Sequence, residues 1–169
     1  IEITDFPDEP TEDDVAQARE LVLELVHDFP FTSDADRANA LALLILPFAR
    51  GLFSGPTPMH MLEKPTQGTG ATLIAQGFAL IATGRELAMI TEGGSDEEWR
   101  KRITSTLLTS PSFVCIDNLH HFVNSAALSA ALTSTTWSDR LLGKSENVSP
   151  ANMAAWCATA NNPTVSGEI

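Results

Sequence analysis

One short run of the chain has the residue types and the spacing to bind phosphate. Backbone N–H groups of a glycine-containing turn, together with the amino end of a following helix, can surround phosphate oxygens. Glycines at positions 68 and 70 allow such a tight wrap, and Thr72 stands where a hydroxyl would hold Mg²⁺. The run, which lies between an expected strand and an expected helix, reads Pro65-Thr66-Gln67-Gly68-Thr69-Gly70-Ala71-Thr72.

Two positions of this turn depart from the usual phosphate-binding pattern. Pro65 replaces the first glycine, which is a mild change. Ala71 occupies the position of a lysine whose ammonium group would contact the phosphates. Loss of a charge-assisted contact worth about 1.5–3 kcal/mol would weaken nucleotide binding roughly ten- to 150-fold. We therefore expect weak nucleotide binding through the backbone and negligible hydrolysis.

Two apolar segments end in polar side chains that suit the same chemistry. The run Phe113-Val114-Cys115-Ile116-Asp117 reads as a strand that ends in a carboxylate, which would hold Mg²⁺ through water. The run from Ala155 to Asn161 reads as a strand that delivers an amide, which would contact a γ-phosphate or the attacking water. We expect Asp117 and Asn161 to converge, from neighbouring strands, on the turn between Glu63 and Leu73.

The segment from Gly55 onward alternates short strands with helices, a pattern that indicates an α/β fold with a parallel sheet. Ser95 is followed by three acids, which favours a helix start at that point. The strands are expected at 59–63, 87–91, 112–117 and 153–160, the helices at 72–82, 95–108 and 125–132, and a hairpin at 139–148.

The first 54 residues are expected to form an acidic lead-in and a two-helix extension packed on the core, residues 55–169. Thr11 and Asp14 have capping-box spacing, and apolar residues then repeat at the helical period until the segment 28–31 ends the helix. Ser33 and Asp36 repeat the start signal. They predict a more buried helix over 38–53, kinked or stopped near Pro47.

Charge and cysteine usage restrict the partners and the compartment. The net charge is −12, but residues 1–36 hold 12 of the 22 acids, so the rest of the chain is nearly neutral. Contact with DNA would need a ring of subunits or a local patch; the cluster of bases at 100–102 is either such a patch or a solvated or subunit-facing surface. Cys115 and Cys157 lie in apolar runs and are expected to be buried thiols of a cytoplasmic protein. No apolar run is long enough to span a membrane.

Together these runs resemble AAA+-type ATPase domains of helicase- or primase-like proteins from phages, plasmids and integrated elements. The resemblance extends from about residue 29 to the end of the chain. Besides the turn itself, it is carried by Asp28-Phe29-Pro30-Phe31, Thr91-Glu92-Gly93, Glu98-Trp99-Arg100-Lys101-Arg102-Ile103, Ile116-Asp117-Asn118, residues 125–132, Thr136-Trp137-Ser138-Asp139-Arg140 and Thr159-Ala160-Asn161-Asn162.

The resemblance implies a P-loop NTPase fold of the AAA+/ASCE-like kind, ATP and Mg²⁺ as cofactors, and a homo-oligomeric ring that acts on DNA. Family members carry the lysine that Ala71 replaces, so hydrolysis is expected to be lost or crippled, either by engineering or by loss in nature. A fifth strand, a lid and the family's arginine finger would lie beyond Ile169. The alternatives are a non-catalytic module for oligomerisation or partner binding, and an unrelated α/β domain with a chance glycine-rich turn.

The group that activates water is a separate question. Many proteins of the resembled class place a glutamate after the strand-ending aspartate, whereas this chain has Asn118, whose amide cannot act as a base. Glu92 follows the strand after the turn's helix, and RecA-like ATPases draw their glutamate from a similar place. Glu92 is therefore a candidate base, and a turn carboxylate before Gly93-Gly94 is the alternative interpretation.

Overall fold

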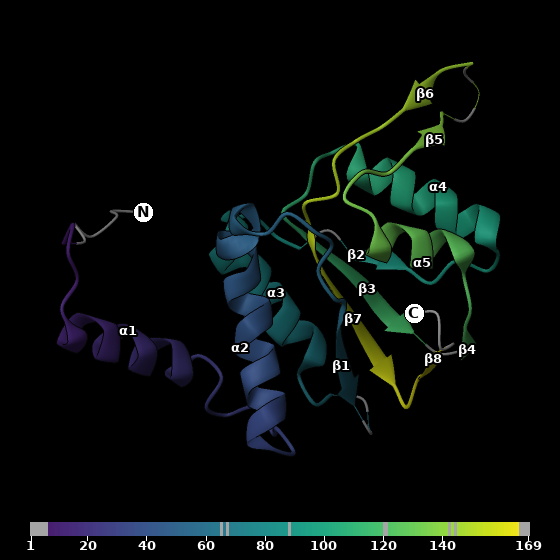
Figure 1. The fold of residues 1–169 in the computed structure, drawn as a ribbon. Coiled ribbons are helices and arrows are strands. Elements are labelled where there is room, and N and C mark those ends of the chain that lie inside the picture. Colours follow the sequence, from purple (N-terminus) through teal and green to yellow (C-terminus); the bar gives the residue numbers. More distant parts are fainter. Residues whose placement is uncertain are drawn as a thin grey trace.

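A four-stranded parallel sheet forms the centre of the molecule (Figure 1). The computed structural model describes residues 7–64, 66, 68–87, 89–119, 122–141, 143 and 145–165. In spatial order the strands are β1 (His60–Lys64), β7 (Ala155–Asn161), β3 (Phe113–Leu119) and β2 (Met89–Thr91). Every neighbouring pair in this sheet is parallel. The expected α/β class, with helices flanking a parallel sheet, is confirmed.

Within the described residues, five α-helices surround or extend from the sheet, and local capping signals begin four of them. Side chains of Thr11, Ser33, Ser95 and Ser125 each accept a hydrogen bond from a backbone N–H of the helix that follows. The helices are α1 (Glu12–Glu24), α2 (Asp34–Ala49), α3 (Ala71–Thr83), α4 (Asp96–Leu107) and α5 (Ala126–Thr133), with a 3₁₀ turn, η1 (Arg50–Leu52), after α2.

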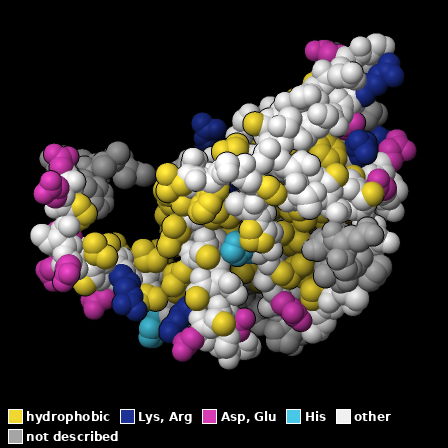
Figure 2. Space-filling view, viewed as in Figure 1, with side chains coloured by type: hydrophobic (Ala, Val, Ile, Leu, Met, Phe, Trp, Pro, Cys, Tyr) yellow, Lys and Arg dark blue, Asp and Glu magenta, His cyan; other side chains and the backbone are white. Residues whose placement is uncertain are grey.

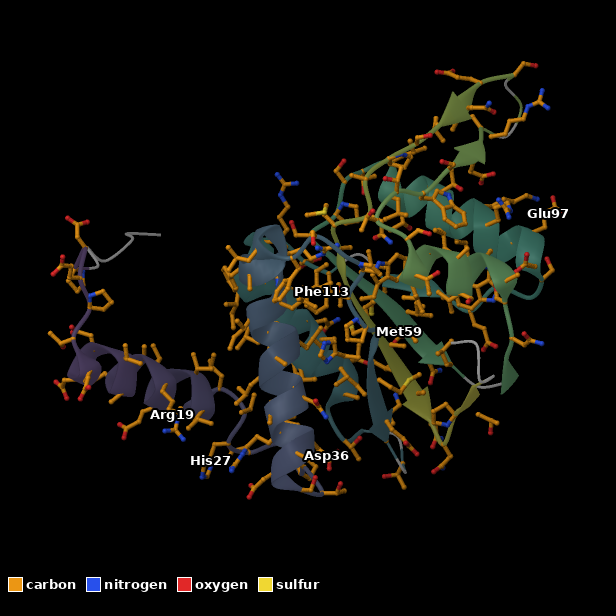
Figure 3. The ribbon with its side chains drawn as sticks, in the orientation of Figure 1. Arg19, His27, Asp36, Met59, Glu97 and Phe113 are labelled. Carbon is orange, nitrogen blue, oxygen red and sulfur yellow. The ribbon has the colours of Figure 1, made fainter. Side chains whose placement is uncertain are left out.

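Strand residues alternate between two apolar layers, because successive side chains point to opposite faces of a sheet. Val114 and Trp156 lie in the layer formed with α4 and α5. Phe113 and Cys157 lie in the layer formed with α2 and α3, and Figure 3 shows Phe113 among the side chains beneath α2. Trp99, Trp137 and Trp156 are all buried, as expected of core residues.

The connections explain which helices cover which face. The chain passes from β1 through α3 to β2 at the far edge of the sheet, and then returns through α4 to β3 and through α5 to β7. Right-handed crossovers that run in opposite directions must use opposite faces. The packing agrees, since α3 belongs to one apolar layer and α4 and α5 belong to the other.

Both cysteines are buried and free, as expected. They are paired in register on adjacent strands, Cys115 on β3 and Cys157 on β7. A hydrogen bond with Cys115 and burial raise the pKa of the Cys157 thiol well above its ordinary value. The Cys157 thiol is therefore a core side chain in its unreactive, protonated form.

A carboxylate joins the two helices on one face of the sheet. Asp96, in the first turn of α4, accepts hydrogen bonds from the Ala127 N–H at 2.9 Å and from Ser125 Oγ at 2.7 Å. The hydrogen bonds from Ala127 and then Ser125 lower the pKa of Asp96. The start of α5 is thus attached to the start of α4.

The amino-terminal helices differ from expectation in three ways. Helix α1 ends at Glu24, before the expected stop at 28–31, because tighter turns follow it and bring Val26 into the core. Helix α2 continues through Pro47 and ends at Ala49, shortly after the proline. The expected packing of both helices on the core holds for α2, which contacts α3, β1 and β7; α1 packs against the core through the partly buried Val22, although none of its residues is fully buried.

In the part of the chain that the structure describes, two small sheets lie outside the central one. Strands β5 (Asp139–Arg140) and β6 (Asn147–Val148) are antiparallel and form the expected hairpin. Strands β4 (Phe122–Val123) and β8 (Thr164–Val165) form a parallel pair that the sequence did not indicate. Within the described residues, no helix combines the length and the apolar character needed to cross a membrane.

Candidate functional site at the carboxyl edge of the sheet

The glycine-containing turn connects β1 to α3 at the carboxyl edge of the sheet. Gly68 and Gly70 have φ angles of 85° and 88°, which only glycine adopts without strain. A Cβ on Gly70 would also lie 2.9 Å from Phe29 Cε1, so a larger residue there would require the Phe29 ring to shift. Thr69 Oγ1 donates to the Thr66 carbonyl at 3.4 Å within the turn. Pro65 and Gln67 of this turn lie outside the described residues.

Helix α3 begins directly after this turn and differs from the other α-helices at its amino end. Its N-cap is Gly70, and no side chain makes a cap hydrogen bond there. Helical bonding starts with the Ile74 N–H, which donates to the Gly70 carbonyl at 2.9 Å. An external acceptor such as a phosphate oxygen can therefore bind the first-turn N–H groups, which include those of Ala71 and Thr72.

The structure brings the predicted hydroxyl and the predicted carboxylate together. Thr72 Oγ1, in the first turn of α3, donates to Asp117 Oδ1 of β3 at 3.2 Å. Both residues are partly exposed. A threonine hydroxyl beside a carboxylate suits Mg²⁺, which is bound by one or two protein oxygens together with phosphates and waters. The residues present therefore fit the ion that the sequence pattern implies.

A third side chain, Thr159, completes this arrangement, and sequence reasoning missed it. Thr159 lies in β7 with none of its surface exposed, and its hydroxyl donates to the same Asp117 oxygen at 2.8 Å. That hydroxyl also accepts the backbone N–H of Asn118 at 2.8 Å. The available signal was a hydroxyl within an otherwise apolar strand, because a buried polar group needs a partner.

A β-bulge in β3 explains why this backbone N–H reaches a side chain. Ile116 pairs with Ala158 and Leu119 with Ala160, so β3 has one more residue than β7 over this interval. Asn118 takes up the extra length with a φ of 60°, a left-handed conformation that asparagine tolerates better than most residues. The bulge ends the regular ladder at the residue where Asp117 meets its partners.

The other two predicted catalytic residues, Asn161 and Glu92, lie on the same edge of the sheet, on opposite sides of β3. Asn161 ends β7, between β1 and β3, and its Oδ1 accepts a hydrogen bond from Asn162 Nδ2 at 3.1 Å. Glu92 directly follows β2, whose last residue, Thr91, pairs with Asp117. Glu92 is therefore next to the carboxylate strand on its outer side, whereas Asn161 is on its inner side.

A basic residue at this edge was not singled out from the sequence. Lys64 ends β1 and is paired in register with Asn161. Residues paired in this way share a face of the sheet, and Leu62, two residues earlier, packs in the layer that contains α3. Among the strands of the central sheet, Lys64 is the one lysine or arginine.

The basic cluster on α4 is paired with acids. Arg100 contacts Asp139 at 3.4 Å, Lys101 contacts Glu97 at 2.6 Å, and Arg102 contacts Glu98 at 3.6 Å. These contacts neutralise the cluster locally, which favours a solvated surface over a DNA-binding patch at this position.

The described residues contain no group of three or more His, Cys, Asp or Glu side chains that could hold a metal ion by itself. A nucleotide-bound Mg²⁺ does not require such a group, because phosphates and waters complete its coordination.

The sequence matches no protein-family model, and no curated protein is significantly similar to it. A function for the carboxyl edge of the sheet must therefore be argued from the positions and contacts of its residues.

Proposed function

We propose that this chain is the ATP-binding core of a helicase-like AAA+ ATPase that acts on DNA, with hydrolysis lost or crippled by Ala71. The observation that carries the proposal is the hydrogen bond between Thr72 and Asp117, 45 positions apart in sequence. It joins the amino end of α3 to a carboxylate at the bulge of β3, which is the pairing that a Mg²⁺–polyphosphate site requires.

The position of the edge in the fold supports a ligand site. In open α/β sheets, ligands bind outside the carboxyl ends of the strands, where successive connections leave for opposite faces. The connection after β1 goes to the face covered by α3, and the connection after β3 goes to the face covered by α5. The glycine-containing turn follows β1, and Asp117 lies near the carboxyl end of β3.

Each residue of the edge has a role in this proposal. Backbone N–H groups of residues 66–72 surround the phosphates, Thr72 binds Mg²⁺, and Asp117 holds it through water. Bound Mg²⁺ supplies charge neutralisation at the phosphates. Asn161 contacts the γ-phosphate or the attacking water, and Glu92 polarises that water. Copies of the chain assemble as a ring, and DNA contact comes from the ring because the α4 bases are paired.

Ala71 leaves the phosphates without the ammonium group that usually follows the last glycine of such a turn. Lys64 is a substitute source of positive charge, because its register places it on the face of α3 at the same edge. The site as it stands then binds Mg²⁺–ATP weakly, through backbone N–H groups and one lysine, and its turnover is negligible.

Calorimetric titration of Mg²⁺–ATP into the protein and into Ala71→Lys tests this function. We expect the lysine to raise the affinity at least tenfold, because it adds a charge-assisted contact of about 1.5 kcal/mol or more. Ala71→Met is the matched control, since it adds length without charge, and it should leave the affinity near that of the unmodified protein. Equal affinities for all three proteins would contradict the proposal.

The role of Glu92 has its own test. In the Ala71→Lys background, Glu92→Gln should abolish most ATP turnover while leaving ATP affinity nearly unchanged, because the amide cannot take a proton. An unchanged turnover rate would remove Glu92 from the mechanism and would favour its interpretation as a turn carboxylate before Gly93.

A second candidate function is a non-catalytic module that keeps the fold for oligomerisation or partner binding. Ala71 and Asn118 favour it, since both replace groups that hydrolysis uses in the resembled class. In that case Ala71→Lys would bind no nucleotide, while the chain would still associate with copies of itself or with a partner.

A further inference from the structure

Helix α4 holds the segment that carries Glu92 at two points. Arg102 Nη1 donates to the Thr91 carbonyl at 2.8 Å and also to the Thr91 hydroxyl. Glu98 Oε2 accepts the backbone N–H of Gly94 at 3.1 Å, and Arg102 Nη2 lies 3.6 Å from the same Glu98 oxygen. Glu98 and Arg102, named here the α4 clamp, therefore bind the residue before Glu92 and the residue two positions after it.

The backbone between these two contacts lies directly against α4. A Cβ on Gly93 would be 2.8 Å from both the backbone N and the side-chain Cγ of Trp99. Trp99 is 4% exposed and belongs to the core, so it cannot move aside without disturbing the packing. The α4 clamp and this close approach together restrict the path of residues 91–94 along the start of α4.

Helix α4 is itself fixed to the body of the molecule. Ile103 and Leu107 have no exposed surface and lie in the core layer that includes β3. Asp96 accepts hydrogen bonds from the start of α5, which lies on the same face of the sheet. A segment that is bound to α4 is therefore held in position relative to β3 and its Asp117.

Strand β2 alone would hold Glu92 less firmly. The strand has three residues, and among the described residues β3 is its one neighbouring strand. Thr91, the last residue of β2, pairs with Asp117, so Glu92 follows at the edge where the candidate site lies. The ends of short edge strands open readily, whereas the α4 clamp adds contacts that involve ionised groups.

The exposure of the α4 clamp indicates a role in position rather than in folding. The side chains of Glu98 and Arg102 are 52% and 35% exposed, and ion pairs near the surface contribute little to stability. Acidic and basic side chains lie next to one another over this end of α4 (Figure 2), where Figure 3 labels Glu97. Glu97 and Lys101 form an ion pair within the same helix and offer a matched control for the α4 clamp.

We propose that Glu98 and Arg102 are positioning residues that hold Glu92 beside Asp117, within reach of the water that attacks the γ-phosphate. This role rests on the proposed function, because Glu92 needs a fixed position only if the site hydrolyses ATP. A base acts when its carboxylate lies within hydrogen-bond distance of that water. A displacement of about 1 Å at such a site slows a reaction about a hundredfold, so the α4 clamp affects the rate more than the binding of ATP.

Steady-state turnover of the Ala71→Lys protein tests this role. Arg102→Gln in that background should lower kcat about tenfold or more and leave the KM for Mg²⁺–ATP nearly unchanged, because the phosphates are bound elsewhere. Arg102→Lys should keep most of the activity, since its ammonium group can still donate to the Thr91 carbonyl. Lys101→Gln is the matched control and should turn over ATP as fast as the Ala71→Lys protein.

A double variant shows whether Arg102 acts through Glu92. Once Glu92→Gln has removed the base, the addition of Arg102→Gln should lower turnover no further, because the positioning residue has no base left to hold. Additive losses would overturn the proposal. An Arg102→Gln protein that keeps the turnover of its background would overturn it as well.

Amide hydrogen exchange of the chain without Ala71→Lys, followed by NMR, reports on the α4 clamp in the absence of nucleotide. The Gly94 N–H should exchange roughly fivefold faster in Glu98→Ala, the loss of about one hydrogen bond, whereas Glu97→Ala should leave it unchanged. Unchanged exchange in Glu98→Ala would overturn the α4 clamp alone. Absence of turnover in the Ala71→Lys protein would instead contradict the proposed function, and the positioning role would fail with it even if Gly94 exchanged faster.

Discussion

The carboxyl edge of the sheet and the α1 arm, residues 11–24, are built in opposite ways. At the edge, Thr72, Asp117 and Thr159 come from three elements distant in sequence and meet in hydrogen bonds of 3.2 and 2.8 Å. In the arm, the bonds join near neighbours, such as Thr11 with Asp14 and Gln17 with Asp13, each at 2.8 Å. The edge exists only when the whole sheet has formed, whereas the bonds of the arm need only its own residues.

This contrast predicts where the molecule tolerates change. A substitution near the edge or beneath it disturbs several elements at once, because side chains from different elements share partners there. A substitution in the α1 arm changes a side chain that is not buried, so it should affect folding little. The predictions below follow this contrast from the largest expected effect to the smallest.

The sheet core should be far more sensitive than the arm. Trp156 is 1% exposed and its Nε1 donates to Asn152 Oδ1 at 3.0 Å. Trp156→Ala should lower the free energy of unfolding by about 3–5 kcal/mol. Leu21→Ala in α1 should change it by less than about 0.5 kcal/mol. Urea unfolding followed by circular dichroism measures both; similar losses would show that Leu21 contributes as much to folding as the sheet core.

The charge at the edge should affect nucleotide binding directly. Lys64→Gln should weaken Mg²⁺–ATP binding about tenfold or more, the loss of a contact worth roughly 1.5–3 kcal/mol. In the Ala71→Lys background the same change should cost less, because the restored ammonium already neutralises the phosphates. Calorimetry measures both, with Lys101→Gln on α4 as the control. Equal losses in the two backgrounds would mean that Lys64 acts independently of the phosphate site.

The buried hydroxyl of Thr159 should matter for stability and for the site together. Thr159→Val keeps the shape but removes both hydrogen bonds, which leaves the Asn118 N–H without this acceptor and should cost about 1–3 kcal/mol of unfolding free energy. Mg²⁺–ATP affinity should also fall, because Asp117 loses the group that orients it. Thr133→Val is the control, since Thr133 is exposed and bonds only within α5. A stable variant with unchanged affinity would remove Thr159 from the site.

Local signals in the sequence predicted most of the helices and the strands. Capping residues such as Ser33 and Ser95 mark helix starts because the side chain and the N–H that it accepts lie three positions apart. The expected end of α1 was wrong because its turns depend on the burial of Val26, a tertiary contact. The exposure of Val15 and Leu21 in α1 was also missed, since helical periodicity indicates an apolar face but not what covers it.

The candidate site was only partly accessible from the sequence. Thr72 and Asp117 stand out because each occupies a fixed place in a short pattern, and the structure brings them into contact. Thr159 and Lys64 carry no such pattern. Their relevance depends on the strand order β1-β7-β3-β2 and on the bulge after Ile116, which arise from pairing between distant segments. A polar residue in a strand therefore becomes informative only when its neighbours across the sheet are known.

The central claim is that the turn before α3 and the end of β3 together bind a Mg²⁺–polyphosphate. Titration of isotope-labelled protein with Mg²⁺–ATP, followed by the backbone amide signals in NMR spectra, tests it most directly. The account predicts that the largest shifts fall on Gly68, Gly70, Thr72 and Asp117, and that Asp117→Asn reduces them. Shifts that are absent from these residues, or scattered evenly over the molecule, would contradict it.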